Sequence, residues 1–103
     1  MFEIIVPEGH DTMSKVTLDG TVYVLRFTYN GTQDYWSIGI YDESENPIIP
    51  MTKIVPLYKL FNYAYTDLPK GILFCDCPNE VVRENDFKNR VAHIVYIEEA
   101  DVK

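Results

Sequence analysis

The sequence predicts an all-β protein, a single small antiparallel β-barrel or β-sandwich with little helix. Three observations support this prediction. Apolar and polar residues alternate with period two along much of the chain, aromatic and β-branched residues are abundant, and turn signals separate the alternating runs. At 103 residues the chain is expected to form one β domain over residues 1–103, with a single modest core.

The clearest element is a hairpin of two strands in the stretch Thr21–Asp42. Both halves alternate, and the short link Asn30–Asp34 contains an Asn-Gly pair, which tolerates the positive φ of a tight turn. The side chains expected to point into the core are Tyr23, Leu25, Phe27, Trp36, Ile38 and Ile40. A register slip of one residue would exchange the two faces of the hairpin.

Shorter alternating runs on both sides of the hairpin predict further strands, separated by turn signals such as Asp19-Gly20. These strands are expected at Phe2–Val6, Ser14–Leu18, Ile72–Cys77 and Arg90–Glu98. In the last two, Leu73 and Val95 are expected to point inward. The polar residues Glu8–Ser14 are expected to form a loop. This spacing is typical of antiparallel meanders.

Three stretches have less regular patterns. The segment Pro47–Pro56 contains an internal Pro50, and proline cannot donate to a central ladder, so an edge strand or an irregular arm is expected. Leu57–Tyr65 fits both a helical face and a strand, and is expected to form a helical turn or an extended packing segment. Pro78–Lys88 is polar, with Phe87 as its one large apolar anchor.

The chain carries a formal net charge of -7. Direct binding to nucleic acid or to an anionic membrane surface is therefore not expected, because both need clustered Lys and Arg. The apolar runs are shorter than the ~18 residues of a membrane span, and the opening MFEIIVPEGHD has no basic leader, so neither a transmembrane segment nor a secretory signal is expected. The acidity also fits the simpler alternative that it only keeps the protein soluble.

Residues with catalytic chemistry are sparse, and we expect no enzyme activity, no cofactor and no metal site. The sequence contains no phosphate-binding loop, nucleophile elbow or zinc-protease motif. Cys75 and Cys77 would point to the same face of a strand, a poor geometry for a disulfide, so buried free thiols are expected. A thiol–imidazole pair with His93 is the catalytic alternative, although no orienting group or oxyanion hole accompanies it.

Three arginines lie next to apolar or aromatic residues. Arg26 interrupts an apolar strand, and Arg83 and Arg90 flank the aromatic anchor Phe87. Each fits a surface ion pair with an acidic residue, and each equally fits a contact with another protein, for which Arg and Tyr are favoured residue types. Composition does not separate these alternatives.

The order of the elements resembles a known family. The stretches that show it are VTLDGTVYVLRFTYN, YWSIGIYDESENPII, KIVPLYKLF, LPKGILFCD and RVAHIVYI. The most specific residues are Leu18-Asp19-Gly20, Tyr23, Tyr29-Asn30, Trp36, Pro47-Ile48-Ile49, Leu68-Pro69, Gly71, Leu73 and Val95-Tyr96. Together they resemble the small baseplate plug proteins of contractile-tailed bacteriophages, best described from the cyanophage baseplate. The chain departs from the pattern at Ser44-Glu45-Asn46, where a glycine turn is expected.

The resemblance implies an all-β fold and a non-catalytic role as a plug or hub component of a phage or prophage tail baseplate. It implies a location in the virion, with assembly in the bacterial host cytoplasm. The implied partners are the hub, tail-tube and spike proteins, together with further copies of this chain, because tails are rotationally symmetric. The alternative class is a free-standing β-barrel that binds a small apolar ligand.

If the chain is a plug, its interface is expected in Pro47–Pro56 and Leu57–Tyr65, which combine aromatic side chains with backbone that cannot complete a sheet. The individual candidates are Tyr58, Phe61, Tyr63, Tyr65, Arg26 and Arg83. The alternative is that both segments only cap the open end of the barrel.

Overall fold

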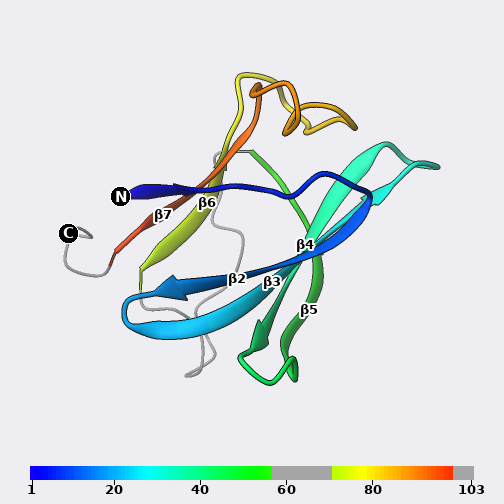
Figure 1. Cartoon of the computed structure of the whole chain (residues 1–103). Helices are drawn as coiled ribbons and strands as arrows, with labels where there is room; N and C mark the ends of the chain where they lie inside the picture. The colour runs from blue at the N-terminus through cyan, green and yellow to red at the C-terminus, as the bar shows by residue number, and fades with distance from the viewer. Residues whose placement is uncertain (57–70, 99–103) are drawn as a thin grey trace.

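Seven β-strands and no helix make up the part of the chain that the computed structural model describes, residues 1–56 and 71–98 (Figure 1). The strands are β1 (Phe2–Ile4), β2 (Asp11–Leu18), β3 (Thr21–Asn30), β4 (Tyr35–Asp42), β5 (Pro47–Lys53), β6 (Ile72–Asp76) and β7 (His93–Ile97). The predicted all-β class is confirmed.

The strands form two antiparallel sheets. One has the order β1-β7-β6 and the other the order β2-β3-β4-β5. In Figure 1, β1 and β7 lie side by side above the long strands of the four-stranded sheet. Within the described residues the sheets do not close into a barrel, so of the two predicted architectures the sandwich is the one observed.

The central hairpin is confirmed as β3 and β4, with Tyr29 paired to Trp36 and Asn30 to Tyr35. Its link differs from the expectation, because the left-handed residue is Asp34, at φ 55°, and not the Asn-Gly pair. The side chain of Asn30 accepts hydrogen bonds from the next backbone N–H groups of the link, and this side-chain cap replaces a tight two-residue turn.

The other hairpin turns also show local side-chain chemistry. Asp19 and Gly20, at φ 50° and 82°, form the tight β2–β3 turn that the sequence predicts. After β4, the Asp42 carboxylate accepts N–H bonds from Ser44 and Asn46, both at 2.9 Å. Glu45 takes the left-handed conformation there, at φ 65°. The capped turn thus does without the glycine that the resemblance leads one to expect.

All six hairpin side chains expected to point inward are buried, as is Leu73. The prediction for Val95 is wrong, because Ile94 and Tyr96 are the fully buried residues of β7 and Val95 lies on the opposite face. This strand is apolar on both faces, so alternation alone could not assign its orientation. Pairing to both neighbours decides it, because it places Ile94 beside Ile4 and Cys75.

Tyr96 joins the two sheets. Its hydroxyl donates a hydrogen bond to the carboxylate of Asp19, in the β2–β3 turn. The backbone N–H of Gly71 donates to the same hydroxyl at 2.8 Å. Gly71 has no room for a side chain, since a Cβ there would lie 2.0 Å from the carbonyl oxygen of Ile97. The glycine therefore permits a close backbone approach beside the joint.

The ends of the predicted strands shift. The expected loop over Glu8–Ser14 is wrong in part, because Asp11–Ser14 belong to β2 and pair with β3. Tertiary pairing outweighs the polar local sequence at this point. The expected edge strand within Pro47–Pro56 is confirmed as β5, next to β4 only. Leu57–Tyr65 lies outside the described residues. No helix in the described part of the chain is long and apolar enough to cross a membrane.

Candidate interaction surfaces

Of the six predicted interface residues, the structure describes two. Tyr58, Phe61, Tyr63 and Tyr65 lie outside the described residues. Arg26 belongs to β3, and Arg83 belongs to the long connection between β6 and β7. The structure places each arginine in an ion pair, so the first of the two alternatives is observed for both. Their role in an interface stays a prediction.

Arg26 lies on the face of the four-stranded sheet that points away from the core. Its guanidinium donates two hydrogen bonds to the Asp11 carboxylate, from Nε at 2.8 Å and from Nη2 at 2.7 Å. This paired geometry matches the fork of the guanidinium to both carboxylate oxygens. The hydrogen bond from Arg26 lowers the pKa of Asp11 below its ordinary value. The pair therefore stays ionised at neutral pH and clamps β2 to β3.

The same outer face carries aromatic and sulfur-containing side chains. Met13 is 44% exposed. The ammonium of Lys53 lies over the ring of Tyr35, 5.3 Å from its centroid. Gly39 lies opposite Arg26 in the ladder, and a Cβ there would come within 2.6 Å of the Met51 sulfur. Aromatic residues, Met and Arg are enriched at protein interfaces, so this face is a candidate contact surface.

Arg83 fastens the β6–β7 connection to the central hairpin. Its Nη1 lies 2.8 Å from the carboxylate of Asp34, and its carbonyl accepts the indole N–H of Trp36 at 2.9 Å. Asp34 also accepts the hydroxyl of Tyr29 at 2.5 Å. This bond raises the pKa of Tyr29 to about 12 and holds the pKa of Asp34 below its ordinary value. This group of two charged and two aromatic side chains, which we call the loop lock, thus holds the β6–β7 connection against the central hairpin.

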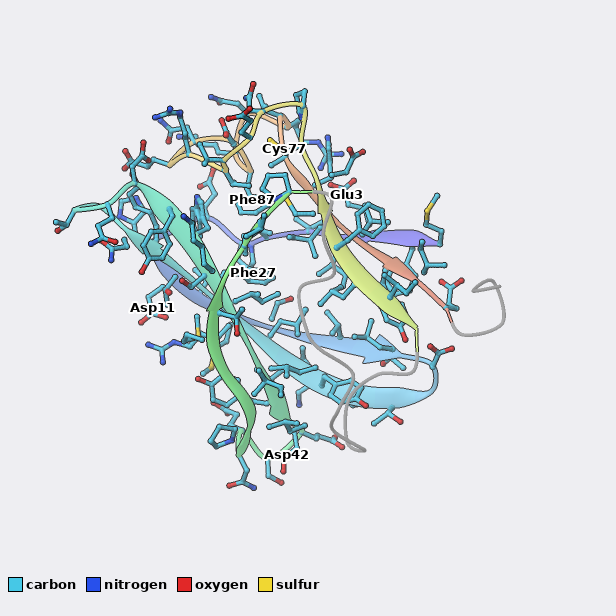
Figure 2. All side chains as sticks on the ribbon, turned by 180° about the vertical axis from the view of Figure 1, so that it is seen from behind. Glu3, Asp11, Phe27, Asp42, Cys77 and Phe87 are labelled. Atoms are coloured by element: carbon cyan, nitrogen blue, oxygen red, sulfur yellow. The ribbon has the colours of Figure 1, made fainter. Side chains whose placement is uncertain are left out.

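A cleft opens beside the loop lock, between the N-terminal residues 6–10 and the loop residues 84–88. Its volume is about 220 Å³. The rings of Trp36 and Phe87 line it, with centroids 5.3 Å apart and near-perpendicular planes. Phe87 also contacts the core residue Phe27, and Figure 2 labels both side chains. Aromatic side chains therefore form the inner wall of the cleft.

Charged side chains surround the opening of the cleft. Glu84 lies 2.9 Å from the Nε2 of His10, whose ring packs 5.1 Å from that of Tyr29. Glu8 and Lys88 complete this rim. A second cavity of about 170 Å³ shares residues with the first and extends along the N-terminal segment, past Ile4 and Ile5.

Sequence reasoning missed this cleft. Its walls come from three stretches that are far apart in the chain, and no local motif joins them. The only signals were the single large apolar residue in the polar stretch, Phe87, and a histidine in a polar loop, His10.

A third candidate surface is the outer face of β6 and β7. Leu73, Cys75, Ile94 and Tyr96 of these strands point into the core. Their neighbours in the chain therefore form the opposite face, with Ile72 paired to Ile97 and Phe74 to Val95. All four are half-buried and apolar. Apolar side chains that stay partly accessible on the outer side of a sheet suit contact with another protein.

The residues of the catalytic alternative, the two cysteines and His93, all belong to the described part of the chain. Cys75 and Cys77 are free and buried, as the sequence predicts. Burial raises the pKa of the Cys75 thiol to about 12, so it stays protonated and weakly nucleophilic at neutral pH. The Nδ1 of His93 lies 2.7 Å from the carboxylate of Glu3, so these two side chains form a pair. Within residues 1–56 and 71–98, no three His, Cys, Asp or Glu side chains come together as a metal site.

These observations define a class of protein: a small two-sheet β domain whose notable features are surfaces for contact. Residues 1–99 match the family described as cyanophage baseplate Pam3 plug gp18. The chain belongs to this family of phage baseplate plugs, and its role is that of a structural component of a phage tail baseplate. No curated protein matches the chain.

Proposed function

We propose that the protein is a non-enzymatic plug subunit that contacts the hub, tail-tube and spike proteins of the tail. Several copies form a symmetric ring or cluster, which assembles with the tail in the bacterial host cytoplasm. Membership of the baseplate plug family supports the location, and tail symmetry supports the ring. In such a ring each copy contacts the next through two different patches.

The observation that best supports protein contacts is the outer face of β6 and β7. Two cross-strand pairs place Ile72, Phe74, Val95 and Ile97 on one side of the sheet, away from the core. None of these four belongs to the set of side chains that pack against the core. Burying such a face against a partner would add roughly 25 cal/mol for each Å² of apolar surface removed from water.

The rival function, a free-standing ligand-binding barrel, needs a closed wall of strands around a cavity. The described strands form two separate sheets, and the cleft beside Trp36 opens at the surface. The arrangement therefore favours contact with macromolecules.

Mass spectrometry of purified tail particles tests the proposal. We expect the chain in intact tails at a fixed ratio to the hub protein. We expect a Phe74→Thr variant, and a variant with Tyr58→Ser and Tyr63→Ser, to fold normally by circular dichroism but to be lost from tails. Glu43→Gln, in the exposed turn after β4, is the matched control and is expected to be incorporated normally.

The outcomes are distinct. Absence of the wild-type chain from tails would overturn the baseplate role itself. Normal incorporation of both folded interface variants would remove the two proposed contact surfaces while leaving the location in place. A thermal-shift screen in which a small apolar ligand stabilises the protein specifically would favour the rival function.

A further inference from the structure

The cleft beside Trp36 has an inner wall that offers aromatic surface and no free indole donor. Trp36 is 3% exposed, and its N–H is already bonded to the carbonyl of Arg83. Phe87 packs edge-on against it. A group that enters the cleft therefore meets aromatic carbon, chiefly that of the half-buried Phe87, and such a surface favours an apolar stem or a cation over the ring.

The rim adds a net negative charge. The residues that line it include two carboxylates, Glu8 and Glu84, and one ammonium, Lys88. Within the described residues, Glu8 forms no ion pair, and Glu84 pairs only with His10. The side chain of Glu84 is 48% exposed, so it has room for a second partner. The rim thus has one more carboxylate than it has ammonium groups, in a chain whose net charge is already -7.

An arginine side chain matches both parts of the cleft. Its methylene stem suits the apolar wall, its planar guanidinium stacks on aromatic rings, and its fork of donors pairs with carboxylates. An uncharged apolar side chain would leave the free carboxylate of Glu8 without a partner. An acidic side chain would meet two carboxylates, with Lys88 as its single attraction.

We propose that this cleft is a docking site for an arginine side chain on a neighbouring protein. That this neighbour is a tail protein depends on the function proposed above, whereas the arginine chemistry depends only on the cleft.

The chain provides its own probe, because Trp36 is its one tryptophan. Binding is followed on the full chain by the Trp36 indole N–H resonance and by fluorescence. The ligand is the capped tripeptide Gly-Arg-Gly. The comparison ligands are the same peptide with citrulline, which keeps the shape but not the charge, and with glutamate. We expect saturable binding of the arginine peptide with a dissociation constant on the order of 1–10 mM, because one side chain makes few contacts.

Charge variants test the rim. Removing one exposed carboxylate with Glu8→Gln or Glu84→Gln is expected to weaken binding of the arginine peptide about two- to fivefold. Glu43→Gln, remote in the chain, is expected to leave the affinity unchanged, and thermal melts check that each variant folds. Lys88→Gln is expected to strengthen binding, because it removes the one opposing charge.

Equal binding of the citrulline or glutamate peptide would overturn the proposal, and so would the absence of a saturable Trp36 response. The proposed function is tested separately by the tail particles. If the arginine peptide binds while the chain is absent from tails, the docking site stands and its partner lies elsewhere. If the chain is in tails but no peptide binds, the proposed docking site is rejected and the proposed function is kept.

Discussion

The four-stranded sheet and the N-terminal segment, residues 1–10, differ in how much of their attachment comes from ion pairs. The central strands β3 and β4 bury large apolar side chains, among them Phe27, Leu25 and Ile38, each 0% exposed. The N-terminal segment pairs β1 with β7 and buries Ile4, and it adds several ion pairs to these contacts. Among the described residues, its ion pairs with the C-terminal part are Met1 N–Glu98 at 2.7 Å, Glu3–Arg90 at 3.0 Å, Glu3–His93 at 2.7 Å and His10–Glu84 at 2.9 Å.

This difference in attachment implies a difference in sensitivity. Burial of an apolar side chain is worth about 1.5–3 kcal/mol and is little affected by salt. Exposed ion pairs contribute about 0–1 kcal/mol each and are screened. The N-terminal segment also carries three of the five exposed large apolar side chains of the described residues, Met1, Phe2 and Ile5. Salt and pH are therefore expected to act more on this segment, which forms one wall of the cleft, than on the core of the four-stranded sheet.

The largest expected effect is on stability, at the buried core of the four-stranded sheet. Phe27→Ala removes a fully buried ring that contacts Phe87, so we expect a loss of about 3–5 kcal/mol in the free energy of unfolding. Met13→Ala, at an exposed position of the neighbouring strand β2, is expected to cost less than about 0.5 kcal/mol. Urea unfolding measures both. A similar loss for the two variants would contradict a core centred on the hairpin.

A smaller effect is expected at the joint between the sheets. Gly71→Ala would put a methyl group 2.0 Å from the Ile97 carbonyl and 2.6 Å from the Tyr96 hydroxyl, so backbone must shift at a cost of about 1–3 kcal/mol. Gly31→Ala is the control, since its Cβ would lie 3.7 Å from the Tyr29 ring. Thermal melts compare the two variants. Equal melting temperatures would show that the backbone beside Gly71 can shift with little loss of stability.

The hairpin could be predicted because its local signals agree. Period-two alternation, aromatic composition and short polar links all place the same residues inward, and every one of the six hairpin predictions is confirmed. The prediction that Val95 points inward was wrong because β7 is apolar on both faces. Only the pairing of β7 with β1 and β6 fixes the orientation of this strand. The predicted loop was wrong over Asp11–Ser14 because pairing with β3 outweighed the polar local sequence.

The candidate surfaces were harder to predict. A sequence shows that Arg26 and Arg83 are charged, but it does not show that Asp11 and Asp34 lie within 2.8 Å of them. The cleft depends on contacts between segments 47 residues or more apart in the chain, as in the bond from Trp36 to the carbonyl of Arg83 and the ion pair of His10 with Glu84. Long-range contacts of this kind leave no periodic signal in the sequence.

The smallest expected effect tests the charged side of the comparison, at Glu3. Hydrogen bonds from His93 and Arg90 hold the pKa of this carboxyl below its ordinary value of 4.5, with the His93 bond as the largest cause. A carboxyl with a lowered pKa in the folded state binds its proton more weakly there than in the unfolded chain. Its contribution is therefore complete above pH 4.5 and is lost as the pH falls through the folded-state pKa.

Glu3→Gln removes this titration and keeps the shape of the side chain. At pH 7 we expect the variant to be less stable than the wild type by less than about 1 kcal/mol, because the pair is partly exposed. The difference should shrink toward zero as the pH is lowered from 5 to below the folded-state pKa, since the protonated glutamic acid then resembles glutamine. Hydrogen exchange of the β1 amides should show the same trend locally, while the amides of β3 stay protected. Glu43→Gln is expected to show no such pH-dependent difference. A constant difference at all pH values would mean that Glu3 acts through shape, and that charge does not hold the N-terminal segment in place.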